Sequence, residues 1–212
     1  MNTETMNIHK ALCELKLLDA RLTKEIGALE AVGTTKAYSQ KVGAVSVEDF
    51  ARRAKETYQS IQDLMSRRNA IRRAVMLSNA TTAVLIGGTE YTVAEAIEMK
   101  NHGIEFLARL CSRLSTSYNA CAQRVDEENE ALDRKADAYV SAITGSRDLK
   151  NISEEVKRLR EHYVSDQRIE LVNPLHAEKT ISELSDRVDR FVSDVDSALS
   201  TSNAVTQITV TY

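Results

Sequence analysis

A joint between a helix and a strand occurs twice in this chain, once at mid-sequence and once at the C-terminus. The first joint, at 78–86, reads SNATTAVLI, and the second, at 202–212, reads SNAVTQITVTY. Ser, Asn and Thr compete for backbone hydrogen bonds and favour helix ends, whereas β-branched residues favour strands. The repeated joint predicts a single helical domain made of two related halves, at about 7–91 and 92–212.

Long helices are expected because the chain has one proline and seven glycines in 212 residues. Apolar residues recur at helical spacing along most of the sequence. Asn173 is expected to cap the last helix, with Pro174 at its first position, where proline is preferred. The expected elements are helices over about 7–30, 46–77 and 92–144, a short helix over about 152–163, an extended segment at 168–172 and a last helix from 173.

The third expected helix carries an unbroken seven-residue repeat of inward-facing positions. Such a repeat favours coiled-coil packing. A coiled coil also needs apolar residues at a second position of each repeat. Here that position holds Leu107, Leu114 and Cys121, but then the polar residues Glu128 and Lys135. The distal part of this helix is therefore expected to pack less tightly or to project. The repeat consists of Ile97, Ile104, Cys111, Tyr118, Val125, Leu132 and Tyr139.

A β-hairpin is expected at 82–92, where Gly87-Gly88 separates two short strands. A two-stranded hairpin alone is marginal in water, so it needs a third strand or a covering surface. The C-terminal run 206–212 is one candidate for that strand, and a neighbouring subunit is the other. The predicted fold class is mostly α: an antiparallel, coiled-coil-like bundle of long helices with a small antiparallel β-sheet at one end.

Composition argues against several classes of function. The formal net charge is -3, so no global basic field exists to hold nucleic acid or an anionic membrane. No apolar run reaches the roughly 20 residues that cross a bilayer. The N-terminus lacks the basic-then-apolar order of a signal peptide. These features predict a cytoplasmic protein without nucleic-acid or membrane partners.

The three cysteines, Cys13, Cys111 and Cys121, show no metal-ligand spacing. Cys111 and Cys121 are about 15 Å apart along one expected helix, too far for a disulfide. All three cysteines are expected to be reduced and mostly buried. No metal or cofactor is predicted.

Arg68 is the most unusual charged residue, because it falls on the apolar stripe of the second expected helix. A guanidinium keeps its charge, so at such a position it needs an anion or several acceptors. One possibility is an internal ion pair with Glu14, Asp19 or Glu128. The other is an anionic ligand in a subunit groove, with Arg72 one turn on as a second donor.

Other residues complete this predicted binding set. Lys100 and His102 lie on the first turns of the long helix, near the hairpin. They are expected either to line a pocket there or to lie on an exposed helical turn. No nucleophile-and-base set is evident, so an enzyme is the least supported class. The predicted ligand-binding residues are Arg67, Arg68, Asn69, Arg72, Tyr91, Lys100 and His102.

The stretch from Ile61 onward, IQDLMSRRNAIRRAVMLSNATTAVLIGGTEYTVAEAI, resembles a septicolysin-like family of small helical-hairpin proteins from bacteria and tailed phages. The matching features are Arg67-Arg68-Asn69, Ser78-Asn79-Ala80 and Gly87-Gly88. The resemblance implies a mostly helical homo-oligomer, such as a hexamer, of phage origin, without an established activity. Its family label hints at a pore former, but the chain has no tryptophan and no basic amphipathic face.

Two functions follow as hypotheses. The first is a non-catalytic homo-oligomer that sequesters a small phosphorylated, nucleotide-like signalling ligand at an Arg-lined subunit boundary in the host cytoplasm, as an anti-defence sponge. The second is a phage virion protein, such as a neck, collar or tail component, without a small-molecule ligand. Long helices and exposed strand edges suit such assembly. In that case Arg68 belongs to a structural ion pair and 206–212 docks onto a neighbouring chain.

Overall fold

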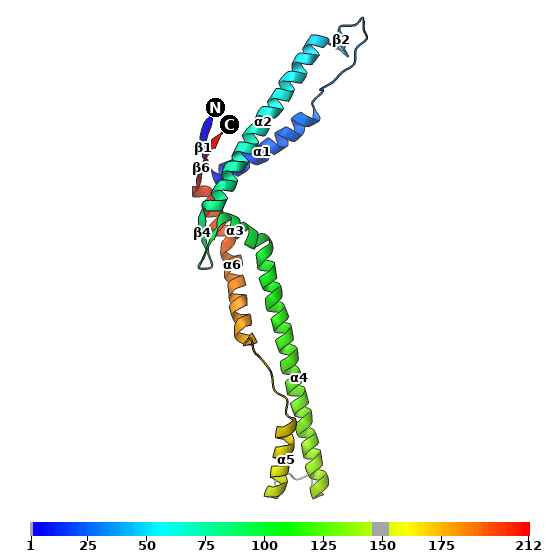
Figure 1. Cartoon of the computed structure of the whole chain (residues 1–212), viewed down its shortest axis with the longest axis vertical. Helices are drawn as coiled ribbons and strands as arrows, with labels where there is room; N and C mark the ends of the chain where they lie inside the picture. Colours follow the sequence, from blue (N-terminus) through cyan, green and yellow to red (C-terminus); the bar gives the residue numbers. More distant parts are fainter. Residues whose placement is uncertain (1, 146–152) are drawn as a thin grey trace. The chain divides into compact units, whose positions relative to one another are not determined.

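The computed structural model describes residues 2–145 and 153–212 (Figure 1). The chain forms two compact units: unit 1 comprises Met1–Asn101 with Arg190–Tyr212, and unit 2 comprises His102–Asp189. The fold is mostly helical, with long antiparallel packed helices and small antiparallel sheets, as predicted. The elements are β1 (Thr3–Asn7), α1 (Ile8–Gly27), β2 (Lys41–Val42), β3 (Val45–Ser46), α2 (Val47–Thr81), β4 (Ala83–Ile86), β5 (Thr89–Thr92), α3 (Val93–Glu98), η1 (Met99–Gly103), α4 (Ile104–Thr144), α5 (Glu154–Gln167), α6 (Ala177–Val205) and β6 (Gln207–Thr211).

Unit 1 is built on the antiparallel pair α1 and α2. Each helix begins at a polar cap, because a side-chain oxygen of the preceding residue accepts a hydrogen bond from a free N–H of the first turn. Asn7 caps α1 through the N–H of Lys10, and Ser46 caps α2 through the N–H of Asp49. The predicted start of the second helix at Ser46 is confirmed. The short hairpin β2–β3, within a segment expected to be a loop, precedes it.

The C-terminal strand β6 pairs with β1, at the opposite end of the sequence. Figure 1 shows the two strands side by side next to α2, with both chain ends at this place. The predicted strand at 206–212 is confirmed, but the expectation that it completes the 82–92 hairpin is wrong. Threonines face each other across the ribbon at Thr3–Thr211 and Thr5–Thr209, a favourable cross-strand pairing.

The core of unit 1 lies where this ribbon packs on the two helices. The inward residues of β1 and β6 alternate with exposed ones, as expected for a sheet with one buried face. Burial of these apolar side chains fixes the register, since a shift by one residue would turn each of them to solvent. The core residues are Met6, Ile8, Ala11, Leu15, Leu18, Ile71, Val75, Ile208 and Val210.

The hairpin β4–β5 forms at the predicted place and pairs only its own two strands. Gly87 and Gly88 both have positive φ, 56° and 80°, as a two-residue turn of this type requires. The backbone N–H of Gly87 donates to the Asp194 carboxylate at 3.2 Å, and a Cβ at Gly87 would lie 3.1 Å from Arg190 Cβ. Thr92 and Glu95 form a capping box at the start of α3.

Unit 2 contains α4, α5 and the first part of α6. The expected single helix 92–144 is divided by η1, a π-helical segment that accommodates an extra residue in the turn. Ile97 therefore falls out of phase with the seven-residue repeat and is 37% exposed, whereas Ala96 is buried. At the other end Tyr139 is 50% exposed and stacks on Tyr163 of α5, with ring centroids 6.1 Å apart, while α4 buries Ala136 and Val140 there. The predicted inward position of Ile97 is thus wrong, and Tyr139 is covered only in part.

The helices after α4 also depart from the expected boundaries. The short helix α5 is present, although Ile152 lies outside the described residues. The segment 168–172, expected to be extended, contains neither helix nor strand, and Arg168 has extended backbone angles. α6 begins at Ala177 rather than at Pro174, because His176 has a φ of 47°, which no α-helix contains. Asn173 is therefore not at the N-cap as predicted, but its side-chain oxygen accepts from the N–H of Ala177, the first residue of α6, at 2.8 Å.

All three cysteines are free thiols, as predicted, but they are not mostly buried. Cys13 and Cys121 are exposed and Cys111 is half-buried. Cys13 lies on the outer side of α1, since Ala11, Leu15 and Leu18 make its buried stripe.

Within residues 2–145 and 153–212, no helix is both long and apolar enough to span a bilayer.

We expect Gly87→Ala to destabilise the protein more than Gly88→Ala. Both substitutions place a side chain in the left-handed region, at a cost of about 1–2 kcal/mol. A Cβ at Gly87 also meets Arg190 at 3.1 Å, whereas one at Gly88 meets nothing within 4 Å. Urea unfolding of both variants measures the difference, and equal losses of unfolding free energy would contradict the close packing of Gly87.

Candidate functional site

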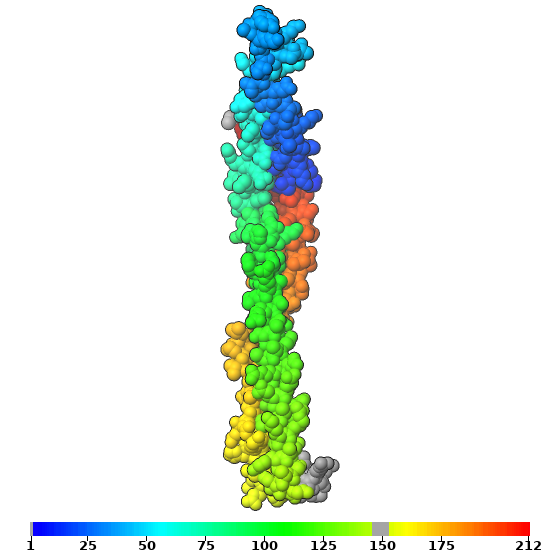
Figure 2. All heavy atoms as spheres, turned by 90° about the vertical axis from the view of Figure 1, so that its right-hand side faces the viewer, coloured from blue at the N-terminus to red at the C-terminus, as the bar shows by residue number. Residues whose placement is uncertain are grey.

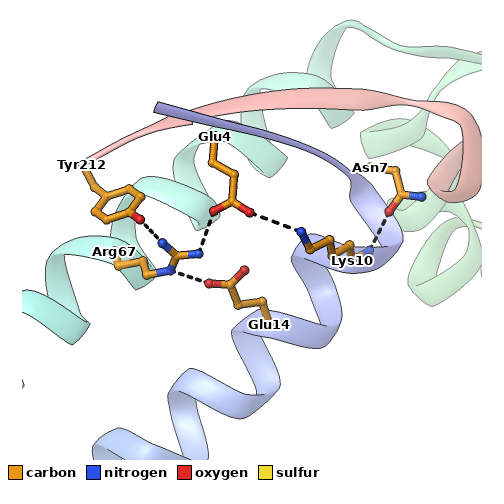
Figure 3. A network of polar contacts seen from close by, with 6 residues as sticks. All are labelled: Glu4, Asn7, Lys10, Glu14, Arg67 and Tyr212. Atoms are coloured by element: carbon orange, nitrogen blue, oxygen red, sulfur yellow. Dashed lines mark hydrogen bonds and ion pairs between the residues drawn. The ribbon is translucent and has the colours of Figure 1, made fainter. Parts of the chain in front are cut away.

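Arg67 of α2 lies at the centre of the densest polar network that involves a predicted site residue (Figure 3). Its Nε donates to the Glu14 carboxylate, Nη2 donates to Glu4 at 2.9 Å, and Nη1 donates to the Tyr212 hydroxyl. The guanidinium also lies 4.6 Å from the centroid of the Tyr212 ring, within cation–π range. We name Glu4, Glu14, Arg67 and Tyr212 the Arg67 cluster.

Four different elements bring the Arg67 cluster together. Glu4 comes from β1, Glu14 from α1, Arg67 from α2, and Tyr212 directly follows β6. The turn at Asn7 orients β1 relative to α1, because its side chain accepts from the Lys10 N–H at 2.8 Å and donates to the Ala204 carbonyl at 3.1 Å. The cluster therefore forms only when β1–β6 is paired and both helices are in place.

Opposite charges stabilise the ionised forms within the cluster. Hydrogen bonds from Arg67 and then Lys10 lower the pKa of Glu4 below its ordinary value. The pKa of Arg67 is raised, chiefly by its hydrogen bond to Glu14. The Arg67 side chain is 23% exposed and that of Glu14 is 19% exposed, so the pair is partly shielded from water.

This geometry makes the Arg67 cluster a clamp between chain segments. All three guanidinium nitrogens already donate to groups of the same chain. A phosphate that bound Arg67 would have to displace Glu4 or Glu14 and leave a partly shielded carboxylate without its partner. The cluster therefore suits a structural role better than anion binding.

Arg68 is 31% exposed and pairs with Asp19 of α1. The expected internal ion pair with Asp19 is thus present, and Glu14, another expected partner, pairs with Arg67 instead. Asn69 accepts a long hydrogen bond from Arg68 at 3.5 Å. Arg72 is exposed and remains accessible to an external anion.

The other predicted binding residues lie among different partners. Tyr91 packs edge-to-face on Phe191 of α6, with ring centroids 5.7 Å apart. Lys100 forms an ion pair with Asp196 of α6. His102 is exposed and belongs to unit 2. The contacts of these three residues involve no member of the Arg67 cluster.

Sequence reasoning missed Glu4 and Tyr212 because the N-terminal residues were not assigned to a strand. The alternation Thr3–Glu4–Thr5–Met6 and the matching threonines at the C-terminus were a signal for this pairing. It also missed Arg160 of α5, which donates to Asp137 at 2.7 Å and Asp133 at 3.1 Å and fastens α5 to α4 in unit 2.

The surface beside the Arg67 cluster is a shallow groove of about 720 Å³. Arg67 and Tyr212 line one part of it, and Glu56 and Asp63 line another. Because the cluster already neutralises Arg67, the remaining charges of this groove are negative, which disfavours a phosphorylated ligand. Among residues 2–145 and 153–212, no group of three or more His, Cys, Asp or Glu side chains is placed to hold a metal ion.

Comparisons of this chain with protein-family models, curated proteins and solved structures found no match. The resemblance to the septicolysin-like family therefore stays a prediction.

We expect Arg67→Met to lower the free energy of unfolding by about 2 kcal/mol, the scale of hydrogen bonds to charged groups. The matched control is Arg73→Met, an exposed position on the same helix that should change stability little. Urea unfolding followed by circular dichroism measures both, and equal effects would contradict the clamp.

Acidification should weaken the clamp through Glu4. Its pKa is lowered in the folded state, so its contribution is complete above the ordinary value of 4.5 and is lost as the pH falls through the lowered value. Glu4→Gln should therefore destabilise the protein at neutral pH and lose that effect in acid. Urea unfolding of variant and parent at both pH values provides the test; a difference that persists in acid would oppose this role.

Proposed function

We propose that this protein is a non-catalytic, self-associating structural subunit. The observation that carries the proposal is the uncovered apolar surface of α4. In α4, all of which the structure describes, the buried residues are Leu132, Ala136 and Val140, so Ile104–Ala131 contributes none. Figure 2 shows α4 (green) at the surface of unit 2 along most of its length.

Helices in folded proteins gain most of their stability from tertiary packing of an apolar face. The repeat positions Ile104, Cys111, Tyr118 and Val125 are only half-buried, although they form an apolar stripe. On an adjacent flank, Phe106 is 67% exposed and Leu110 is 48% exposed. Association with another chain would remove this surface from water and stabilise both copies.

Unit 1 carries a similar excess of exposed apolar side chains. Met76 and Leu77 near the end of α2 are 64% and 68% exposed, and Leu85 of β4 is 68% exposed. Large exposed apolar groups that gather on neighbouring segments are typical of interaction surfaces. Self-association therefore has support in both units.

The arginines predicted to bind a ligand give the sponge hypothesis less support. Arg67 and Arg68 are engaged by Glu4, Glu14 and Asp19, so only Arg72 of the predicted arginines is freely exposed. One exposed arginine gives weak affinity for phosphate. A nucleotide-like ligand remains a prediction, subordinate to the structural role.

The resemblance to the septicolysin-like family adds a biological setting to the proposal, namely the assembly of a phage particle. With a phage origin, a self-associating helical subunit suits a neck, collar or tail component of the virion. Its location is then the virion, after synthesis in the host cytoplasm.

Sedimentation velocity over a wide range of concentrations tests the proposal. We expect a defined oligomer, or reversible association that increases with concentration. A monomer at every concentration would contradict it. Native mass spectrometry of the same untagged protein supplies the second arm, since nucleotide mass bound to each assembly would favour the sponge hypothesis instead.

A further inference from the structure

The two sides of α1 differ in charge. The side that packs in the core consists of Ile8, Ala11, Leu15, Leu18 and Leu22. The residues turned away from it, at about 100° per residue, are all exposed and none is acidic. We name them the outer face of α1: His9, Lys10, Cys13, Lys16, Leu17, Ala20, Arg21 and Lys24. Lys16 and Arg21 lie at its two edges, and Cys13 and Lys24 lie near its middle.

The carboxylates of α1 are turned away from the outer face, because α2 draws two of them to its arginines. Glu14 pairs with Arg67, and Asp19 pairs with Arg68. The third, Glu25, is half-buried. The ion pairs that join the two helices therefore separate the charges of α1, with its acidic groups toward α2 and its basic groups toward solvent.

Three cations of the outer face have no carboxylate partner. Lys10 pairs with Glu4 of β1 at 3.2 Å. Lys16, Arg21 and Lys24 form no ion pair with any residue that the structure describes. The formal net charge of -3 for the whole chain therefore does not describe this surface, which is locally basic.

We propose that the outer face of α1 binds the phosphate backbone of a nucleic-acid duplex without sequence preference. From Lys16 to Lys24 the helix rises about 12 Å, a length over which one strand of a duplex presents about three or four phosphates. Three cations without a partner match that number, and binding them to phosphates releases counterions from the duplex. The proposal replaces the expectation, drawn from net charge, that nucleic acid is no partner, and it does not depend on self-association.

Other anionic partners fit the outer face less well. A helix binds an anionic membrane surface by inserting its apolar side among the lipids, but the apolar side of α1 is buried in the core of unit 1. Lysine is depleted from interfaces between proteins, whereas phosphates are contacted chiefly by Lys and Arg. On α1, all of which the structure describes, Leu17 is the one large apolar side chain of the outer face, at 72% exposed.

The side chains of the outer face favour a duplex over a single strand. Proteins that bind single strands stack the bases on aromatic side chains. The eight residues of the outer face include no aromatic side chain other than the His9 imidazole. The contacts are then to phosphates, which position a protein on nucleic acid but carry no sequence information directly.

Fluorescence anisotropy of a labelled DNA duplex of about 20 base pairs tests the proposal with the full chain. We expect binding in about 25 mM NaCl that weakens as salt is added, with a slope of log K against log salt of about -2.7 for three phosphate contacts. The triple variant Lys16→Gln, Arg21→Gln and Lys24→Gln should bind at least about tenfold more weakly and lose most of this slope. A parent protein that leaves the anisotropy unchanged in low salt would overturn the proposal.

A matched control removes the same charge elsewhere. Lys55→Gln, Arg73→Gln and Lys135→Gln change three exposed cations that lie outside α1. Each triple variant loses three positive charges, so both have a formal net charge of -6 instead of -3. The control should bind the duplex like the parent. If it loses as much affinity as the α1 variant, binding depends on overall charge and the assigned face is wrong.

Two further probes test the class of partner. Vesicles that contain anionic lipid and polyglutamate are each mixed with the parent and with the α1 variant. If either probe binds through the outer face of α1 and the duplex does not, the assigned class is wrong. Sedimentation velocity of the α1 variant should match that of the parent, so this inference and the proposed self-association fail independently. Circular dichroism confirms that helix content is unchanged in each variant.

Discussion

The contact between Arg67 and the two ends of the chain is the constraint on which unit 1 depends. One guanidinium on α2 holds Glu4 of β1, Glu14 of α1 and the C-terminal Tyr212. Beneath it, the β1–β6 ribbon packs its alternate residues on α1 and α2. The apolar burial stabilises this core, and the ionic contacts select the one register in which both chain ends meet α2.

The pairing of arginines with carboxylates of the same chain argues against phosphate binding as the function of these residues. Arg67 and Arg68, two of the three arginines predicted to bind a phosphate, are paired with carboxylates of the same chain, and the groove beside Arg67 is lined by Glu56 and Asp63. The described residues leave apolar surface partly exposed to water, above all along α4. A structural role in a self-associated state follows more directly from this surface than ligand capture does.

Much of the local structure could be predicted from sequence. The caps at Ser46 and Thr92, the Gly87-Gly88 turn and the C-terminal strand all depend on neighbouring residues only. The candidate site was predicted less well. Asp19 was one expected partner of Arg68, but Glu4 and Tyr212 are brought to Arg67 by strands separated by almost the whole chain. Local patterns contain little information on such pairing.

The sequence by itself determined most of the helices, the caps at Ser46 and Thr92 and the Gly87-Gly88 turn, because propensity, capping and periodicity act over a few residues. Only the tertiary structure decided which strands pair, which arginines are neutralised and which apolar stripes stay uncovered. It also decided the phase of α4, since η1 shifts the repeat by one residue. Each of these depends on which distant segments meet, and that is set by the burial of the whole unit.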